Sequence, residues 1–136
     1  MPVFRIGEVA ELVGVSPDTV RRWVDAGRLP ADRDEQGRRL VDGADLAAFM
    51  REGADDDPAR AFSSARNRFH GLVTAITRDG VMAQVEMQAG VHRVVSLLSR
   101  EAVDEMGLEV GSLAVAVVKS TNVVVETGAG QGVRHA

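Results

Sequence analysis

The sequence contains no cysteine, which excludes disulfide bonds and thiolate metal sites. It has no apolar run approaching the roughly 20 residues of a membrane-spanning helix, and it does not start with the basic-then-apolar pattern of a signal peptide. We therefore expect a cytoplasmic protein with no membrane partner. The sequence shows no pattern that would combine a nucleophile, a base and an orienting group in a catalytic site. It also lacks a phosphate-binding loop with its lysine, so we expect no enzymatic activity.

Lysine is almost absent as well. Lys119 is the only lysine among 16 basic residues, and it stands where the apolar run "VAVV" ends. The 20 acidic residues give a formal net charge of −4, which excludes a generally basic coat but leaves room for a local basic face. Residues 1–53 and 54–136 each hold eight basic and ten acidic residues, so charge does not indicate which half contacts nucleic acid.

The chain changes character near its middle, which predicts an α+β protein with two modules. Residues 1–52 show the spacing of helices, whereas residues 68–126 are rich in Val, Thr and Ile, as strands are. The acidic, Gly- and Pro-containing stretch "EGADDDPARAF" lies between them. The expected organisation is a first domain over 1–53, a linker over 54–62, a second domain over 63–128 and a disordered tail over 129–136.

The stretch "FRIGEVAELVGVSPDTVRRWVDAGRLP" predicts two short helices joined by a tight turn. The first helix has an apolar stripe and ends at Gly14, and Ser16 caps the second, in which Pro17 takes the first position. The second ends at Gly27. The two stripes are Ile6, Val9, Ala10 and Val13, and then Val20, Trp23 and Val24.

A wing is predicted after the second helix. "DEQG" is typical of a turn between two short strands, and Arg38 and Arg39 follow it. Asp42 then caps a third helix whose inward residues are expected to be Leu46, Phe49 and Met50. Arginines of a wing can hold phosphates, while the second helix can read bases in a major groove. The candidates for DNA contact are Ser16, Thr19, Arg21, Arg22, Arg38 and Arg39.

This arrangement resembles the winged helix-turn-helix of MerR and excisionase-like DNA-binding proteins over roughly residues 3–52. The resemblance rests on "IGEVAELVGVSPDTVRRWVDAGRLP" and "GRRLVDGADLAAFM", and it implies DNA as a partner. MerR regulators usually continue into a long dimerisation helix. Pro58 argues against such a helix here, so the second half is expected to form the oligomer.

The second half predicts a small five-stranded barrel of the OB type, with a helix inserted before the last strands. The expected strands cover 68–77, 81–88, 91–98, 113–119 and 122–126, and the helix covers 100–106. About 60 residues bury little by themselves, so pairing with further copies is expected.

Polar residues stand where these strands begin and end. "SSARN" precedes the first strand, Ser99 follows the third, and "KST" follows the fourth. Such positions can meet at one rim or across an interface. They supply hydroxyls, backbone N–H groups, an arginine and a lysine, but no carboxylate, which suits a tetrahedral oxyanion better than a cation. His70, His92 and His135 lack the close spacing of metal ligands, so no metal site is expected.

Residues 63–126 resemble the molbindin (Mop) domain of the TOBE class, through "SARNRFHG", "SREAVDEMGLEVG" and "VVKST". Members of that family bind molybdate or tungstate between subunits. The resemblance implies an oxyanion site formed by Ser64, Ala65, Arg66, Ser99, Lys119 and Ser120, in which Ser99 replaces the family's usual Thr. Asn67 is expected to fix the turn rather than to contact the ligand. A lysine reaches such a dianion as a compact point charge.

Together the two resemblances predict a molybdate- or tungstate-binding transcriptional regulator of molybdenum homeostasis. A molybdate or tungstate store or carrier, with the helix-turn-helix as an adaptor, is the alternative. A third hypothesis is an architectural or excisionase-like DNA protein whose β half only oligomerises. The sequence does not distinguish molybdate from tungstate, dimer from hexamer, or activator from repressor. It also leaves open the operator, the regulated genes and the direction in which the anion changes DNA affinity.

Overall fold

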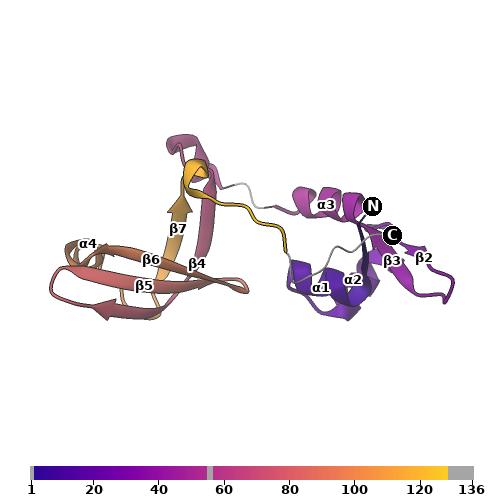
Figure 1. The fold of residues 1–136 in the computed structure, drawn as a ribbon, viewed down its shortest axis with the longest axis horizontal. Helices are drawn as coiled ribbons and strands as arrows, with labels where there is room; N and C mark the ends of the chain where they lie inside the picture. The colour runs from indigo at the N-terminus through magenta and orange to yellow at the C-terminus, as the bar shows by residue number, and fades with distance from the viewer. Residues whose placement is uncertain (1, 55–56, 129–136) are drawn as a thin grey trace. The chain divides into compact units, whose positions relative to one another are not determined.

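The computed structural model describes residues 2–54 and 57–128, which form two compact units. The second unit spans Asp57–Val124, and residues 2–54 belong to the first (Figure 1). The expected tail over 129–136 lies outside the described residues. In the described part of the chain, no helix is both long and apolar enough to cross a membrane.

The first unit contains the predicted helix-turn-helix. Helix α1 (Ile6–Val13) ends at Gly14, whose φ of 83° is the left-handed conformation that glycine adopts without strain. Helix α2 (Pro17–Asp25) begins at Ser16, whose Oγ accepts a hydrogen bond from the backbone N–H of Thr19. Helix α3 (Gly43–Glu52) begins at Asp42, whose carboxylate accepts from the N–H of Ala44. The three caps thus follow the sequence prediction.

A small antiparallel sheet adds the wing. Its strands β1 (Val3–Arg5), β2 (Asp32–Arg33) and β3 (Arg39–Asp42) lie in the order β1-β3-β2. The turn between β2 and β3 holds the "DEQG" residues, so the predicted wing is present. The core of this unit is made of seven buried side chains: Ile6, Val9, Ala10, Val20, Leu29, Val41 and Leu46.

One residue of the predicted core was wrong. Met50 is 44% exposed, whereas Leu46 is buried and Phe49 packs against Trp23 with ring centroids 4.9 Å apart. Met50 follows Leu46 by about one helical turn and so points in nearly the same direction, but it lies two residues before the end of α3, where the buried cluster does not extend.

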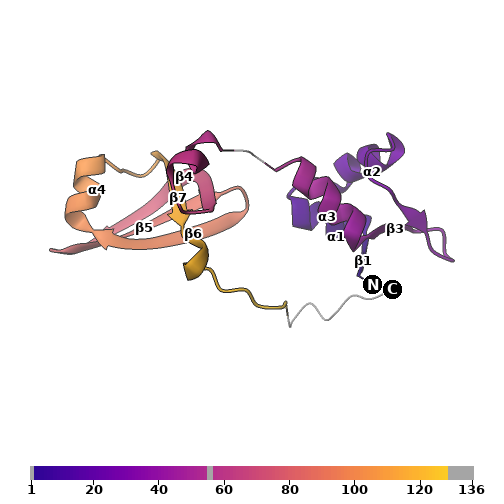
Figure 2. The same ribbon diagram turned by 90° about the horizontal axis from the view of Figure 1, so that it is seen from above.

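The second unit is a curled sheet of four antiparallel strands (Figures 1 and 2). The strands β4 (Asn67–Arg78), β5 (Met82–Ala89), β6 (His92–Ser99) and β7 (Leu113–Val118) lie in the order β6-β5-β4-β7. Helix α4 (Arg100–Met106) follows β6 and packs Val103 into the core with Val73 and Val85. Two short 3-10 helices, η1 (Pro58–Phe62) and η2 (Ser120–Asn122), precede β4 and follow β7.

Strand β4 pairs with two partners in turn, and its register with β5 shifts between Val73 and Ala75. Its first half pairs with β7 from Asn67 to Leu72, and its second half pairs with β5 from Leu72 to Arg78. Gly71 lies at this change of partner, where a Cβ atom would stand 2.3 Å from the Gln88 carbonyl oxygen. The close approach of the two backbones therefore requires glycine.

The expected fifth strand over 122–126 was wrong. The chain turns away from β7 in η2, and residues 123–128 form neither helix nor strand. Val124 and Val125 are 83% and 88% exposed. The run has the composition of a strand, but composition does not supply a hydrogen-bonding edge, and this run pairs with no strand in the described residues. The α+β fold class is confirmed, with a half-barrel of four strands in place of five.

Candidate nucleic-acid and oxyanion sites

The predicted base-reading residues lie together along α2. Arg21 and Arg22 are exposed and Thr19 is half-buried. Arg21 Nη1 donates to Asp18 Oδ1 at 2.6 Å, and Arg22 Nη2 donates to the Thr19 hydroxyl at 3.2 Å. Ser16 Oγ is occupied in part by its helix cap, and it lies 3.0 Å from Thr19 Oγ1. These local contacts are exposed and weak enough to exchange for a nucleic-acid partner.

The two wing arginines differ in their surroundings. Arg38 Nε donates to Asp34 Oδ2 at 2.9 Å within the wing, and half of its side chain remains exposed. Arg39 Nη2 donates to Asp25 Oδ1 at 2.6 Å, and only 25% of its side chain is exposed. Since Asp25 ends α2, the Arg39–Asp25 pair holds the wing against that helix. Arg39 thus stabilises the position of the wing, whereas the Arg38 side chain is more exposed to solvent.

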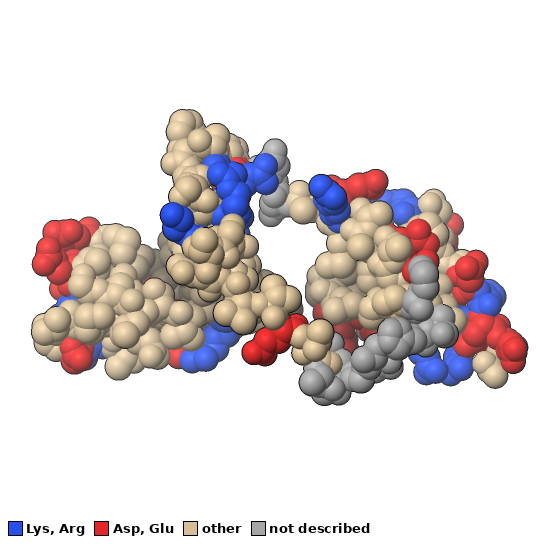
Figure 3. Space-filling view, turned by 45° about the horizontal axis from the view of Figure 1, so that its top comes forward, with Lys and Arg blue, Asp and Glu red and all other residues tan. Residues whose placement is uncertain are grey.

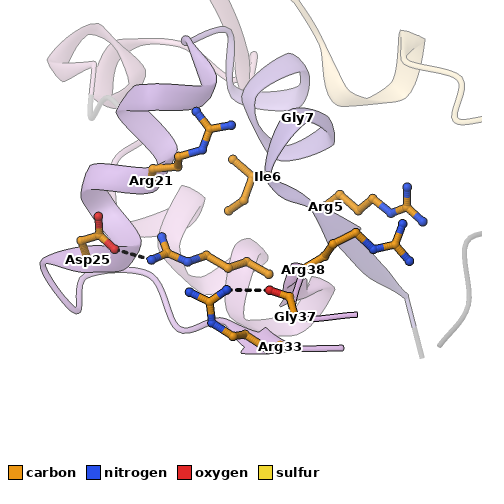
Figure 4. A pocket seen from close by; sticks show the side chains of 9 residues that line it. Arg5, Ile6, Gly7, Arg21, Asp25, Arg33, Gly37 and Arg38 are labelled. Atoms are coloured by element: carbon orange, nitrogen blue, oxygen red, sulfur yellow. Dashed lines mark hydrogen bonds and ion pairs between the residues drawn. The ribbon is translucent and has the colours of Figure 1, made fainter. Parts of the chain in front are cut away.

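An open hollow of about 450 Å³ lies between α2, the start of α1 and the wing. Figure 4 shows Arg5 and Arg38 extending to the same side of it, while Arg33 donates to the Gly37 carbonyl oxygen at 2.6 Å. Its charged lining residues are five arginines and one aspartate: Arg5, Arg21, Arg33, Arg38, Arg39 and Asp25. Such a surface suits phosphate, which accepts charge-assisted hydrogen bonds. Sequence reasoning missed Arg5 and Arg33, although both flank motifs that it had used.

The β4–β7 pairing brings two predicted oxyanion segments together. Asn67 pairs with Val118 across the two strands, so Arg66 and Lys119 are the next residues beyond one end of the ladder. The Asn67 side chain reinforces this, because its Nδ2 donates to the Val118 carbonyl oxygen at 3.1 Å. Asn67 was expected to fix the local turn. Its side-chain partner instead lies on the neighbouring strand, which sequence spacing does not reveal.

The turn before β4 is fixed by Ser63. Its Oγ accepts a hydrogen bond from the Ala65 N–H at 3.1 Å, and its carbonyl oxygen accepts from Arg66 Nη2 at 2.8 Å. Ala65 is buried at 4% exposure, while Ser64 and Arg66 are exposed. Both candidate side chains can therefore be reached from solvent.

Lys119 and Ser120 complete this end of the sheet. Both are exposed at the start of η2, where the Lys119 carbonyl oxygen accepts from the Asn122 N–H at 2.9 Å. Figure 3 shows Lys and Arg side chains gathered on the part of the second unit where β4 and β7 meet η1 and η2. The basic residues of η1, of the turn before β4, of the start of β4 and of the position before η2 are Arg60, Arg66, Arg68 and Lys119. The local charge is therefore positive, although the chain as a whole is acidic.

Ser99 lies at the other end of the sheet. It pairs with Met82, one position beyond the Ala83–Arg78 pair, whereas Asn67 begins the opposite end of β4. At roughly 3.3 Å per residue, the two ends of β4, Asn67 and Arg78, lie about 36 Å apart along the strand. Ser99 therefore lies at least that far along the strand from Asn67. Ser99 Oγ accepts a hydrogen bond from the Ala102 N–H, which leaves its O–H free to donate. Within one chain, Ser99 does not join the other five candidates.

Asp57, inside the predicted linker, belongs to the second unit. Its Oδ2 accepts hydrogen bonds from Arg68 Nε at 2.7 Å and from His70 Nε2 at 2.8 Å, and its Oδ1 accepts from the Ala59 N–H at 2.9 Å. The Arg68 hydrogen bond, followed by those from Ala59 and His70, holds the pKa of Asp57 well below its ordinary value of 3.8. Nothing in the sequence pattern indicated this pairing.

The histidines gather no metal site. In residues 2–54 and 57–128, no group of three His, Asp or Glu side chains could hold a metal ion. His70 is bound to Asp57, His92 is exposed at the start of β6, and His135 lies outside the described residues.

The fold and these motifs place the chain in a known class of protein. Residues 63–125 match the TOBE domain, and residues 5–41 match the MerR family of regulatory proteins. Molybdenum-pterin-binding protein 2 of Clostridium pasteurianum is 38% identical over 63 residues, which cover 46% of this chain and 93% of that protein. The chain therefore belongs to the TOBE-domain family, in its molbindin branch, and carries a MerR-type helix-turn-helix domain. Both predicted resemblances are confirmed.

Other relatives differ in how much they share. Molybdenum transport protein ModE of Herbaspirillum seropedicae is 38% identical over 66 residues, which cover 48% of this chain but 24% of that protein. The structure of MopII from Clostridium pasteurianum is 36% identical, covering 48% of this chain and 98% of that one with a TM-score of 0.45. A structure of the cytoplasmic molybdate-binding protein ModG, with molybdate bound, is 41% identical over 46% of this chain, with a TM-score of 0.42.

Proposed function

We propose that this protein is a transcriptional regulator that binds molybdate or tungstate in its second unit and DNA through its first. The observation that carries the proposal is the β4–β7 register, which sets Arg66 and Lys119 at one end of the sheet with Ser64 and Ser120 beside them. Positive charge and hydrogen-bond donors without a carboxylate ligand match the needs of a tetrahedral dianion. Relatives of this unit are named for molybdenum-pterin binding and for molybdenum transport.

The proposed site needs two copies of the chain. Ser99 lies at the far end of β4 from Arg66 and Lys119, so a second subunit would supply it. Exposed apolar side chains support assembly, because Leu72, Leu113, Val115 and Val117 line one face of β4 and β7. Neither a dimer nor a hexamer is favoured by these contacts alone.

DNA binding is proposed for the arginine-lined hollow and for α2. Arg5, Arg33 and Arg38 would contact phosphates, Arg39 would hold the wing in place, and Thr19, Arg21 and Arg22 would face the bases. An anion bound between subunits can change DNA affinity only if it binds one arrangement of the subunits more tightly than another.

The first test is calorimetric titration of the anion-free protein with molybdate in excess sulfate, with Lys119→Ala as the control. Tight binding that the control loses is the expected result, and absence of binding by the wild-type protein would contradict the oxyanion site. DNA binding is tested separately, by selecting a binding sequence from a random duplex pool and measuring its affinity at moderate salt with and without molybdate.

A store or carrier of the oxyanion is the second candidate. Relatives such as Molybdenum-pterin-binding protein 2 favour it, because the β unit alone covers 93% of that protein's length. Tight molybdate binding combined with DNA binding that is weak and lost at moderate salt would support it. Specific DNA binding that disappears in an Arg21→Ala/Arg22→Ala variant would support the regulator.

A further inference from the structure

The carboxylate of Asp57 lies outside the proposed anion site and fixes the loop that carries Ser64 and Arg66 of that site. Asp57 accepts hydrogen bonds from Arg68 and His70, two side chains on the same face of β4, and from the N–H of Ala59. The Asp57 and Arg68 side chains are 18% and 17% exposed. The Arg21–Asp18 pair, by comparison, is 54% and 85% exposed. Because less solvent screens it, the Asp57–Arg68 pair holds its geometry more firmly.

The Asp57–Arg68 pair closes a loop around the anion-binding motif. Ser64, Ala65 and Arg66 all lie between Asp57 and Arg68 in the sequence, and η1 occupies the first part of the loop. Inside it, Ser63 makes the local turn. With both ends held against β4, Ser64 and Arg66 have fewer conformations to lose when a ligand binds.

We propose that Asp57 is a positioning residue of the oxyanion site, acting through Arg68 and His70 to order the loop that presents Ser64 and Arg66. The inference rests on the proposed oxyanion binding and adds a residue from the predicted linker to it. Asp57 does not bind the anion itself, since its negative charge would oppose a dianion. Its carboxylate engages Arg68 and His70, and this leaves Arg66 and Lys119 as the cations directed to the ligand.

The test compares Asp57→Asn with Glu105→Gln, which makes the same charge change on an exposed carboxylate of α4. Molybdate affinity is measured by calorimetry in excess sulfate. We expect the dissociation constant to rise by about threefold to tenfold in Asp57→Asn, the range for losing an ordering contact rather than a ligand contact. In Glu105→Gln it should stay within about twofold of wild type. An unchanged constant in a folded Asp57→Asn protein would overturn the inference.

Two further measurements separate positioning from general stability. Trypsin cleavage after Arg60 and Arg66, followed without molybdate, should become faster in Asp57→Asn and not in Glu105→Gln. An Asp57→Asn/Arg68→Gln double variant should lose no more affinity than the greater single loss, because both changes break the same contact. Additive losses, or unchanged cleavage, would contradict the proposed role. Should Asp57→Asn fail to fold, His70→Gln removes one contact only, and a smaller loss of affinity is expected.

Titration of wild type and Asp57→Asn with molybdate distinguishes the role of Asp57 from oxyanion binding itself. If wild-type protein binds no molybdate, the proposed function fails, and the positioning role fails with it. If wild type and Asp57→Asn bind molybdate equally, the oxyanion site stands and only the role of Asp57 is overturned.

Discussion

Asn67 donates a hydrogen bond from Nδ2 to the carbonyl oxygen of Val118, which is 51 positions later in the chain. The contact joins the residue after Arg66 to the residue before Lys119. Two segments that are distant in sequence thus share one end of the sheet, and a side chain as well as the backbone ladder fixes their register.

Replacing Asn67 by Ala is expected to lower the free energy of unfolding by about 1 kcal/mol, because a part-buried carbonyl loses its donor. Molybdate affinity should fall as well, since the end of the ladder next to Arg66 and Lys119 loses its side-chain contact and keeps only the backbone pairing. Urea unfolding followed by circular dichroism, together with calorimetry, measures both. Asn122→Ala, in the exposed η2 turn, is the control and should change neither.

Gly71→Ala is expected to destabilise the second unit by about 1–3 kcal/mol, the usual range for overpacking. The added Cβ would meet the Gln88 carbonyl oxygen at 2.3 Å, and both atoms belong to paired backbones that cannot easily separate. Gly80→Ala is the matched control, because a Cβ there meets nothing within 4 Å. Thermal unfolding of the two variants should differ clearly, and equal stability would contradict the close approach.

The stability contributed by Asp57 should depend on pH in one direction. Its pKa is lower in the folded protein than in the unfolded chain, chiefly because of the Arg68 hydrogen bond, so the contribution is present at neutral pH and is lost as the pH falls through and below the ordinary value of 3.8. The difference in melting temperature between wild type and Asp57→Asn should therefore shrink on acidification. Asp79, whose pKa is also lowered, is common to both proteins and cancels. A constant difference from pH 7 to pH 3 would contradict the pairing.

Arg5→Ala and Arg33→Ala should each weaken binding to duplex DNA of any sequence. If each arginine neutralises one phosphate, its loss reduces the slope of log affinity against log salt by about 0.9. Arg51→Ala, an exposed arginine of α3 outside the hollow, should leave the slope unchanged. Fluorescence anisotropy across a salt series measures these slopes.

Co-expressed Lys119→Ala and Ser99→Ala chains should regain oxyanion sites if each site draws Lys119 and Ser99 from different subunits. Random mixing leaves about one quarter of the sites with both residues intact, whereas either variant alone has none. Calorimetric stoichiometry of the mixed oligomer, compared with each pure variant, gives the fraction. No recovery in an oligomer shown by mass spectrometry to contain both chains would contradict a site shared between subunits.

Much of the first unit could be predicted because its signals are local. Gly14, Ser16, Pro17 and Asp42 mark helix ends through contacts within a few residues, and the structure has the helices begin or end there. The prediction for Met50 was wrong because Met50 keeps the helical spacing from Leu46, and spacing alone does not show that the buried cluster ends before it.

The second unit was harder because its decisive contacts are long-range. Strand composition correctly located β4 to β7, but the same composition at 122–126 predicted a strand that has no partner in the described residues. The links from Asn67 to Val118 and from Asp57 to Arg68 and His70 depend on which strands become neighbours. Likewise, the family resemblance grouped Ser99 with Lys119, although strand order places them at opposite ends of β4.

The exposed Lys119 gives the protein a built-in footprinting site. Since it is the only lysine in the sequence, a lysine-specific protease has a single peptide bond to cut, and an amine-directed label has a single ε-amino group to modify. Both reactions take place where β7 passes into η2, in the segment assigned to the oxyanion. Occupancy of the site can thus be followed by the disappearance of one cleavage product, without altering any residue.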